Sequence, residues 1–281
     1  MNFVSLFTGI GGFDIGFERA GMTCTAQVEW DKYATQVLER HWPNVPRFGD
    51  INEVNTNDIG QPDVLCGGFP CQDISQAGQQ AGIAAGTRSG EWHQFARLIV
   101  ECQPAVVVIE NVAALLWSNN GDDMQTVIGH LESCGYQWAY RLLDSQYFGV
   151  AQRRRRVFIV ASRRGERHPS EVLFESEGVR RDSPPSRETT PAVAALTAHG
   201  VGTCGADDNQ AQAGHLIPDI ANTLEPSPRV RKLMPLECER LQGFDDGWTD
   251  NLTDTRRYRA LGNAVTVNVA EWLGRRIMGA A

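Results

Sequence analysis

The feature that most constrains this chain is the alternation of short apolar runs with helical patterns over its first 160 residues. The run at 105–112 (AVVVIENV) is the richest in β-branched residues, as is typical of a strand covered on both faces. Further strands are expected at 2–7, 25–30, 63–68, 136–144 and 156–162, with helices near 12–20, 32–42, 92–102 and 122–134. This alternation predicts an α/β fold with a mixed, mostly parallel sheet and helices on both faces.

The later part of the chain has a different character. From 164 to 230 it is rich in Pro, Gly, Ser, Asp and Asn with little periodicity, which predicts a region that is loop-rich or partly disordered. Regular secondary structure is expected again at 233–244, where a helix can begin at Pro235 and end at Gly243. Apolar residues at helical spacing within 262–277 predict a final helix packed on one face.

Composition narrows the class of protein. No run of about 18 apolar residues occurs, so we expect no membrane span. The opening stretch MNFVSLFTGIGGF lacks the basic region of a signal peptide. The seven cysteines are scattered and form no CxxC pair, which disfavours a disulfide framework and a metal site. A cytoplasmic location, in a reducing environment, fits these features.

The net charge of −8 is unevenly distributed along the chain. Residues 1–150 carry 7 Lys and Arg against 17 Asp and Glu, whereas residues 151–281 carry 19 against 17. The basic residues of the second part cluster at 153–156, 229–232 and 256–259. Clusters on an acidic background favour a local anionic partner, although arginines that are only solvated would look the same.

A glycine-rich turn follows the first expected strand. Gly9, Gly11 and Gly12 would let the backbone approach a ligand closely at the start of a helix. Glu29 follows about twenty residues later, where an acidic residue typically binds the hydroxyls of an adenosine ribose. Asp14 stands where a dinucleotide fingerprint requires glycine, so the pattern favours a nucleoside-type cofactor over nicotinamide.

Cys71 follows the strand expected at 63–68, in the region where open α/β sheets bind ligands. Pro70 would hold the thiol in one orientation. A helix N-terminus or a nearby arginine would lower its pKa enough for nucleophilic attack. On its own, however, a Pro-Cys pair is more often a structural thiol than a nucleophile.

Six motifs occur in order: SLFTGIGG, GGFPCQDIS, IENV, QRRRRVF, LMPLECERLQGF and RALGNAVTVNVA. Together they resemble the successive motifs of the DNA (cytosine-5)-methyltransferases of bacteria and their phages, over residues 3–162 and 229–277. The resemblance implies a Rossmann-like S-adenosylmethionine-dependent fold. It also implies a catalytic and cofactor-binding domain at 1–163, a small loop-rich target-recognition domain at 164–230, and a segment at 231–281 whose last helix returns to the catalytic domain.

The resemblance also implies a mechanism. The Cys71 thiolate would add to carbon 6 of a cytosine, so that carbon 5 can attack the methyl group of S-adenosyl-L-methionine. Glu110 would act at ring nitrogen 3, and Asn111 would be a positioning residue. Arg154 and Arg156, which share one face of a strand, would lie near the target base and its phosphates. The sequence names no base for the carbon 5 proton, and water is our expectation. Double-stranded DNA would be the substrate, with the cytosine flipped out of the helix.

The cofactor residues carried over from the family come from both ends of the chain. Asn263 is informative because it lies in the last motif yet should fold back beside the first. No metal is expected. The set is Phe7, Gly9, Ile10, Gly11, Gly12, Glu29, Trp30, Asp50, Ile51, Pro70, Asn263 and Val265.

Two departures from the family pattern stand out. Glu91 occupies a place near the adenine where relatives more often carry an apolar residue. The region 165–228 is short for a target-recognition domain and has a single aromatic residue, Phe174. Its polar residues are able to read bases or phosphates, or are simply solvated: Arg180, Arg181, Arg187, Asn209 and Gln210.

Several readings stay open. A tRNA cytosine-5 methyltransferase resembles the same motifs but usually carries a Cys-Phe-Thr signature, which is not present here. A catalytically silent DNA-binding relative has no need for Cys71, Glu110, Arg154 and Arg156 together. The leading interpretation is a monomeric DNA cytosine-5 methyltransferase, which a cognate restriction endonuclease would accompany only as a functional partner.

Overall fold

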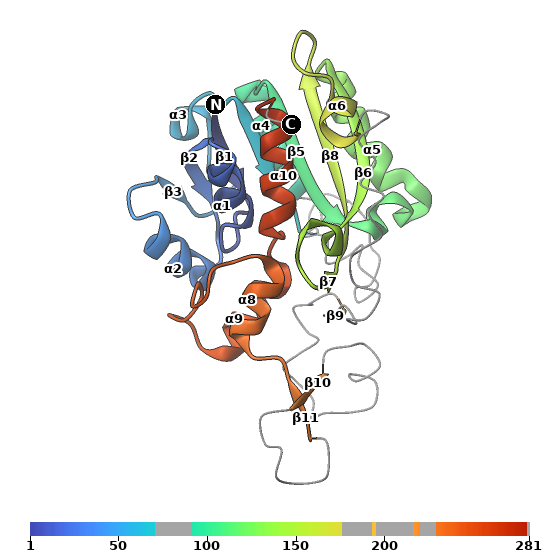
Figure 1. The fold of residues 1–281 in the computed structure, drawn as a ribbon. Helices are drawn as coiled ribbons and strands as arrows, with labels where there is room; N and C mark the ends of the chain where they lie inside the picture. The colour runs from blue at the N-terminus through green and yellow to red at the C-terminus, as the bar shows by residue number, and fades with distance from the viewer. Residues whose placement is uncertain (71–90, 176–192, 195–215, 220–228, 280–281) are drawn as a thin grey trace.

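The computed structural model describes residues 1–70, 91–175, 193–194, 216–219 and 229–279 (Figure 1). Its main feature is a seven-stranded sheet in the order β3-β2-β1-β4-β5-β8-β6. β1 to β5 run parallel to one another, whereas β8 runs antiparallel to both β5 and β6. The prediction of a mixed, mostly parallel sheet is therefore confirmed. The strands are β1 (Asn2–Leu6), β2 (Thr23–Val28), β3 (Arg47–Phe48), β4 (Val64–Gly67), β5 (Val106–Val112), β6 (Tyr136–Asp144) and β8 (Arg155–Arg163).

Helices cover both faces of this sheet because alternate strand residues point to opposite sides. On one face, Leu65 and Val107 pack with Phe95 of α4 and Val127 of α5 in a single core cluster. On the other face, Phe3, Val108 and Phe158 share a cluster with residues of α1, α6 and α10, including Phe17 and Leu273. These helices are α1 (Gly12–Arg19), α4 (Trp92–Cys102), α5 (Asp122–Ser133), α6 (Pro169–Leu173) and α10 (Val267–Ile277).

A third cluster joins the start of the chain to residues far along it. It contains Ile10 and Val37 from the N-terminal part, and Phe244, Trp248 and Leu261 from the later part. The later residues belong to two short helices and the loop between them, which lie below α2 in Figure 1. The elements are α2 (Lys32–His41), α8 (Pro235–Gln242) and α9 (Asp254–Asn263). The helix predicted at Pro235 is confirmed, and Gly243 ends it with a φ of 82°.

The helix predicted within 262–277 begins later than the spacing suggested. Asn263 ends α9, Ala264 and Thr266 have extended backbones, and α10 begins at Val267. The apolar residue Val265 that fitted the helical pattern therefore lies in a short extended connection. Sequence patterns also did not indicate β3, the four-residue helix α3 (Thr56–Ile59), or α9.

Two small sheets are separate from the main one. β7 (Gln152–Arg153) pairs in parallel with β9 (Val193–Ala194), and β10 (Leu216–Asp219) pairs antiparallel with β11 (Arg229–Lys232). Figure 1 shows the β10–β11 ribbon beyond α8 and α9, away from the seven-stranded sheet. Most of the expected loop-rich region 164–230, with Arg180, Arg181, Arg187, Asn209 and Gln210, lies outside the described residues.

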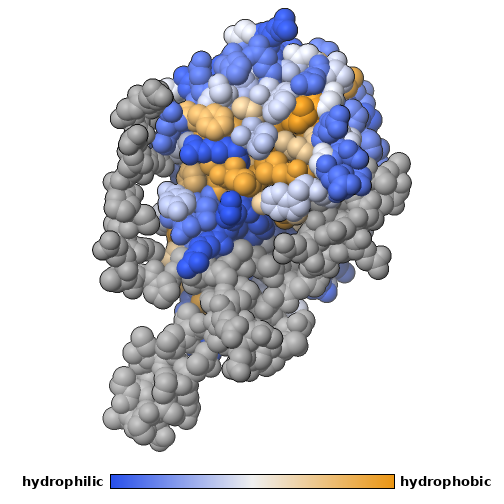
Figure 2. All heavy atoms as spheres, turned by 90° about the vertical axis from the view of Figure 1, so that its right-hand side faces the viewer, coloured by the Kyte–Doolittle hydropathy of each residue, from blue (hydrophilic) through white to orange (hydrophobic). Residues whose placement is uncertain are grey.

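Figure 2 views the side of the molecule that carries α5, β6 and α6, where apolar side chains gather within a hydrophilic rim. β6 is the edge strand there; on it Trp138 stacks with Tyr140 at 6.3 Å. Arg141 lies over the ring of Phe174. Within the described ranges, no helix has the length and apolar character needed to cross a membrane.

Candidate active site

The loop between β1 and α1 has a backbone that few sequences allow. Phe7, Gly9 and Gly11 have φ values of 51°, 60° and 86°, in the left-handed region that favours glycine. A Cβ built on Gly9 would meet no atom within 4 Å among the described residues, so the main chain faces open space there. The loop therefore presents backbone at the carboxyl end of β1, as the glycine pattern predicted.

Glu29 lies beside this loop at the end of β2. Its Oε2 accepts a hydrogen bond from the Gly9 N–H at 2.7 Å, and its Oε1 accepts one from the Asp31 N–H at 2.7 Å. Burial raises the pKa of Glu29 to about 7, although the N–H groups of Asp31 and Gly9 oppose the rise. The carboxylate is thus fixed in place and half-buried, with lone pairs left for ligand hydroxyls.

The last motif folds back onto the first. A Cβ at Gly12 would collide with the backbone carbonyl of Val265, so only glycine permits this close approach. Val265 is half-buried and the neighbouring Asn263 is exposed. The structure thus brings the 263–265 connection against the glycine loop, about 250 residues away along the chain.

The other predicted cofactor residues differ in exposure. Trp30 follows Glu29 and its side chain is 80% exposed. Asp50 is exposed and accepts hydrogen bonds from the backbone and side chain of Asn52, which lower the pKa of its carboxyl. Ile51, by contrast, is buried in the core, and Phe7 stacks on Phe95 at 6.4 Å. Trp30 and Asp50 are therefore the side chains most accessible to a ligand at this end.

Glu91, the residue that departs from the family pattern, precedes α4. Its pKa is raised by burial and then by the charge of Asp50. Both effects disfavour the charged form of Glu91.

The second predicted group lies at the end of β5. Glu110 is 8% exposed, and its Oε1 lies 3.2 Å from Nε of Arg156. β5 and β8 are neighbours, and Val112 pairs with Arg156 in their register. Opposite this pair, a Cβ at Gly68 would lie 2.9 Å from Oε2 of Glu110, so the chain passes close to the carboxylate there.

Asn111 ties β5 to the segment that precedes Cys71. Its Nδ2 donates to the Phe69 carbonyl at 3.3 Å, and its Oδ1 accepts from the Val112 N–H at 2.8 Å. Phe69 is buried against Trp92, and Pro70 follows it, half-buried. Cys71 itself lies outside the described residues, so its predicted role is carried by the sequence.

Arg154 and Arg156 lie on the inner side of their segment, while Arg153 and Arg155 are exposed, as the alternating pattern predicted. Arg154 is only 2% exposed, and its guanidinium donates to the carbonyls of Gly262 at 3.1 Å and Ala264 at 2.9 Å.

Burial, then the charge of Arg156, lowers the pKa of Arg154 to about 9, while the charge of Glu110 opposes the change. In this structure Arg154 thus holds the connection that carries Asn263, whereas Arg156 pairs with the carboxylate Glu110.

Two buried polar groups were not anticipated as parts of the site. Asp14 is 0% exposed and its Oδ1 accepts from Ser5 Oγ at 2.9 Å and Gln27 Nε2 at 2.8 Å. Burial raises the pKa of Asp14 to about 6. The sequence showed Asp14 only as a mismatch to a nicotinamide fingerprint, and the polar pattern of Ser5 and Gln27 inside two apolar strands was the available signal.

The second buried group is a chain of hydroxyls behind Arg154. Ser145 Oγ lies 2.9 Å from Thr266 Oγ1, which donates to Gln242 Oε1 at 2.9 Å. Gln242 in turn donates to the Leu261 carbonyl. These contacts fix α8 and the start of α10 to the turn after β6.

The arrangement suits a nucleoside cofactor beside a reactive base. Glu29 supplies acceptors for ribose hydroxyls, the glycine loop supplies backbone, and Trp30 supplies an exposed aromatic face. Glu110 and Arg156 form an ion pair at the same edge of the sheet, on β5 and β8, and β5 is two strands from β1, which the glycine loop follows. No cluster of three or more potential metal ligands occurs in the part of the chain that the structure describes.

Comparison with known proteins gives a consistent result. A family described as C-5 cytosine-specific DNA methylase matches residues 1–198 and 197–279. The type II methyltransferase M2.BsuMI of Bacillus subtilis (strain 168) is 34% identical over 99% of this chain and 75% of its own length. The type II methyltransferase M.HhaI of Haemophilus parahaemolyticus is 27% identical over 99% of this chain and 94% of its own.

Solved structures share the fold. The Dnmt2 methyltransferase of S. pombe superposes with a TM-score of 0.73 at 17% identity, covering 99% of this chain and 98% of that one. A putative DNA modification methyltransferase encoded within an E. coli prophage gives a TM-score of 0.71 at 18% identity, with 100% and 99% coverage. At these identities the likeness shows the architecture, a Rossmann-like fold.

Proposed function

This chain belongs to the C-5 cytosine-specific DNA methylase family, and we propose that it methylates a flipped-out cytosine in duplex DNA through a covalent adduct of Cys71. As a member of that family it is a DNA cytosine-5 methyltransferase that uses S-adenosylmethionine. The observation that carries the proposed mechanism is the joint placement of three groups. Glu110, near the end of β5, pairs with Arg156 at the start of β8, and Asn111 on β5 donates to the carbonyl of Phe69, two residues before Cys71.

When bound, S-adenosylmethionine supplies the methyl group. We propose that Glu29 accepts the ribose hydroxyls, since its oxygens are already oriented by Gly9 and Asp31. Trp30 and Asp50 would contact the adenine end, and the backbone of Gly9 to Gly12 would follow the amino-acid end with Asn263 and Val265. The proximity of Val265 to Gly12 supports placing the last motif in this set.

The proposed chemistry begins at carbon 6 of the cytosine. A bond would form from Cys71 Sγ to carbon 6, and the π electrons of the carbon 5–carbon 6 double bond would make carbon 5 nucleophilic. Carbon 5 would then bond to the methyl group while the bond from that group to the sulfonium sulfur breaks, which leaves S-adenosylhomocysteine. Glu110 would hold a proton at ring nitrogen 3, which withdraws electrons from the ring. After transfer, loss of the carbon 5 proton to water lets the carbon–sulfur bond break and restores the aromatic ring.

Arg156 would serve two roles in this scheme. Its contact with Glu110 fixes the orientation of the carboxylate, its Nη1 donates to the Arg155 carbonyl at 3.0 Å, and its Nη2 would bind the base or its phosphate. Arg154 would act indirectly, because its guanidinium is bonded to the carbonyls of Gly262 and Ala264. Asn111 would position the Phe69–Pro70 backbone, and through it Cys71.

DNA recognition is proposed for the exposed basic residues and the 164–230 region. Arg153 and Arg155 are exposed beside the Glu110–Arg156 pair and suit phosphate contacts. Since the cytosine atoms are not reachable inside a duplex, base flipping follows. We propose three domains, at 1–163, 164–230 and 231–281, in a protein that acts as a monomer in the cytoplasm. A restriction endonuclease would be a functional partner only.

The test uses tritiated-methyl S-adenosylmethionine with unmethylated duplex DNA of mixed sequence, followed by bisulfite sequencing. We expect incorporation at cytosine, with no incorporation by Cys71→Ser and strongly reduced incorporation by Glu110→Gln. Cofactor binding without transfer to DNA, but with transfer to tRNA, would identify the RNA-directed alternative. Cofactor and DNA binding without any transfer would indicate a silent relative.

A further inference from the structure

The glycine loop that we propose binds the cofactor also accepts a hydrogen bond from Trp248, a residue to which the proposed function assigns no role. The indole Nε1–H of Trp248 donates to the carbonyl of Ile10 at 2.9 Å. Ile10 lies between Gly9 and Gly11, whose left-handed φ values make this the most sharply turned part of the loop. Trp248 belongs to the segment between α8 and α9, 238 residues later in the chain.

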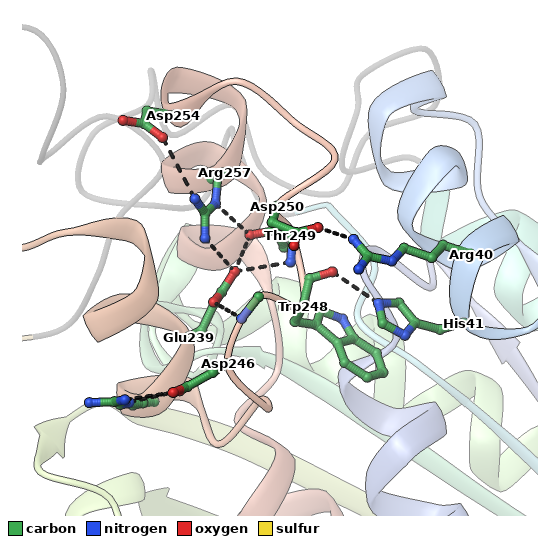
Figure 3. A network of polar contacts seen from close by, with 11 residues as sticks. Arg40, His41, Glu239, Asp246, Trp248, Thr249, Asp250, Asp254 and Arg257 are labelled. Carbon is green, nitrogen blue, oxygen red and sulfur yellow. Dashed lines mark hydrogen bonds and ion pairs between the residues drawn. The ribbon is translucent and has the colours of Figure 1, made fainter.

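Trp248 is itself held firmly. Its ring stacks on His41 with centroids 3.5 Å apart and planes 6° from parallel, and its carbonyl accepts from His41 Nε2 at 2.9 Å. Trp42 and Phe244 pack on the same indole at 5.6 Å and 5.4 Å. Two residues after Trp248, Asp250 forms an ion pair with Arg40 of α2, as Figure 3 shows.

A buried carboxylate fixes the backbone on either side of Trp248. Glu239 of α8 is 0% exposed and accepts from the N–H groups of Gly247 at 2.8 Å and Thr249 at 2.9 Å. Arg257 of α9 donates to the same carboxylate at 2.9 Å, as Figure 3 shows. Burial alone would raise the pKa of Glu239, but the donors from Thr249 and Arg257 outweigh it and the pKa lies below its ordinary value. The carboxylate is therefore a charged anchor for residues 247–249.

We propose that Trp248 is a positioning residue for the cofactor: it holds the Ile10 carbonyl, and with it the Gly9–Gly12 loop, in the conformation that binds S-adenosylmethionine. The inference rests on the proposed function, because it requires that this loop bind that cofactor. The physical reason is that the Ile10 carbonyl shares its peptide plane with the Gly11 N–H, which donates to the Thr8 carbonyl at 3.1 Å. Rotation of this peptide would break that turn, which encloses Gly9, whose N–H orients Glu29. The buried Ile10 carbonyl would otherwise have to find another donor.

The decisive variant is Trp248→Phe, which keeps an aromatic ring against His41 and removes the indole N–H. We expect its dissociation constant for S-adenosylmethionine, measured by calorimetry, to rise about tenfold, because a buried carbonyl loses its donor. Its dissociation constant for unmethylated duplex DNA, measured without cofactor, should stay that of the wild type. The matched control is Trp138→Phe, which removes an indole bond to Glu132 on the surface of β6 and should change neither constant.

Unchanged cofactor affinity in Trp248→Phe overturns the inference, and so does an equal loss of cofactor and DNA affinity with a lowered unfolding midpoint. If that variant does not fold, Thr249→Val decides. It removes the hydroxyl between Glu239 and Arg257 while keeping the indole, so a selective loss of cofactor affinity supports the inference and an unchanged affinity overturns it. A wild-type protein that binds no S-adenosylmethionine would instead defeat the proposed function itself.

Discussion

The Glu110 carboxylate lies 3.2 Å from Nε of Arg156, and both side chains are largely buried where β5 ends beside the start of β8. A guanidinium so placed orients the carboxylate and leaves other N–H groups for a substrate. The pair therefore joins the group proposed to act on the cytosine ring to the group proposed to bind it.

Removing this partner should affect catalysis far more than cofactor binding. We expect Arg156→Met to reduce the single-turnover rate of methyl transfer by about 10²–10³-fold, as losses of a transition-state donor commonly do. Its affinity for S-adenosylmethionine should be unchanged. The matched control is Arg155→Met, at an exposed position, which should weaken DNA binding at low salt and leave the rate intact. Equal rates for the two variants would contradict the assignment.

Cofactor affinity should depend on pH through Glu29, whose pKa is raised by burial to about 7. The carboxyl is protonated below that pH, and only the ionised form offers both oxygens as acceptors. The dissociation constant for S-adenosylmethionine should therefore rise roughly tenfold one pH unit below the pKa, relative to alkaline pH. Glu29→Gln should bind weakly at every pH, with a flat profile between pH 6 and 8 in calorimetry. A wild-type profile without slope would count against this role.

Asp14 should make the folded state less stable as pH rises. Its pKa is raised from 3.8 to about 6, so the folded protein keeps a proton that the unfolded chain has already lost. The contribution of Asp14 to stability is thus fully present below pH 3.8 and is lost as pH rises through 6. Asp14→Asn keeps the acceptor for Ser5 and Gln27 without the charge.

Between pH 4 and pH 8, the unfolding free energy of Asp14→Asn should gain about 2 kcal/mol relative to wild type. Urea unfolding at several pH values measures this difference. Asp50→Asn serves as a control. Asp50 is exposed, so the unfolding free energy of this variant should not rise relative to wild type between pH 4 and pH 8. A constant difference between Asp14→Asn and wild type would show that the carboxyl titrates normally.

Arg154→Met should loosen the connection between α9 and α10. The carbonyls of Gly262 and Ala264 would each lose a donor, at about 1–3 kcal/mol for a buried acceptor. Hydrogen exchange should quicken at residues 263–266, and cofactor affinity should fall. Arg154→Lys, which keeps one cationic donor, should recover part of both. If exchange quickens evenly across all strands, the variant has been destabilised globally and the local role is not supported.

The sheet could be predicted closely because its strands are apolar and regularly separated by helices. β5 and β6 were expected within one residue of their bounds. β3 was not, since two residues give no periodic signal. α9 was missed because few of its residues are apolar; contacts such as Arg257 with Glu239 and Tyr258 with the Leu233 carbonyl attach it to α8 and the chain before it.

The site was predictable where side-chain chemistry repeats a known pattern, as with Glu29 beside the glycine loop. The alternation of Arg153 to Arg156 also indicated which side chains would face inward. A sequence does not indicate which side chains will donate hydrogen bonds to main-chain carbonyls. The contacts of Arg154 and Trp248, which are of this kind, could therefore not be predicted. The role of Cys71 stays a prediction from sequence.

The position of Val265 against Gly12 has a consequence for synthesis on the ribosome. The glycine loop is translated well before residues 248 and 265, which contact it in the folded chain. A nascent chain can pair β1, β2, β4 and β5 long before that point. It should nevertheless reach its full affinity for the cofactor only after residues 248 and 265 have been synthesised and have packed against the loop.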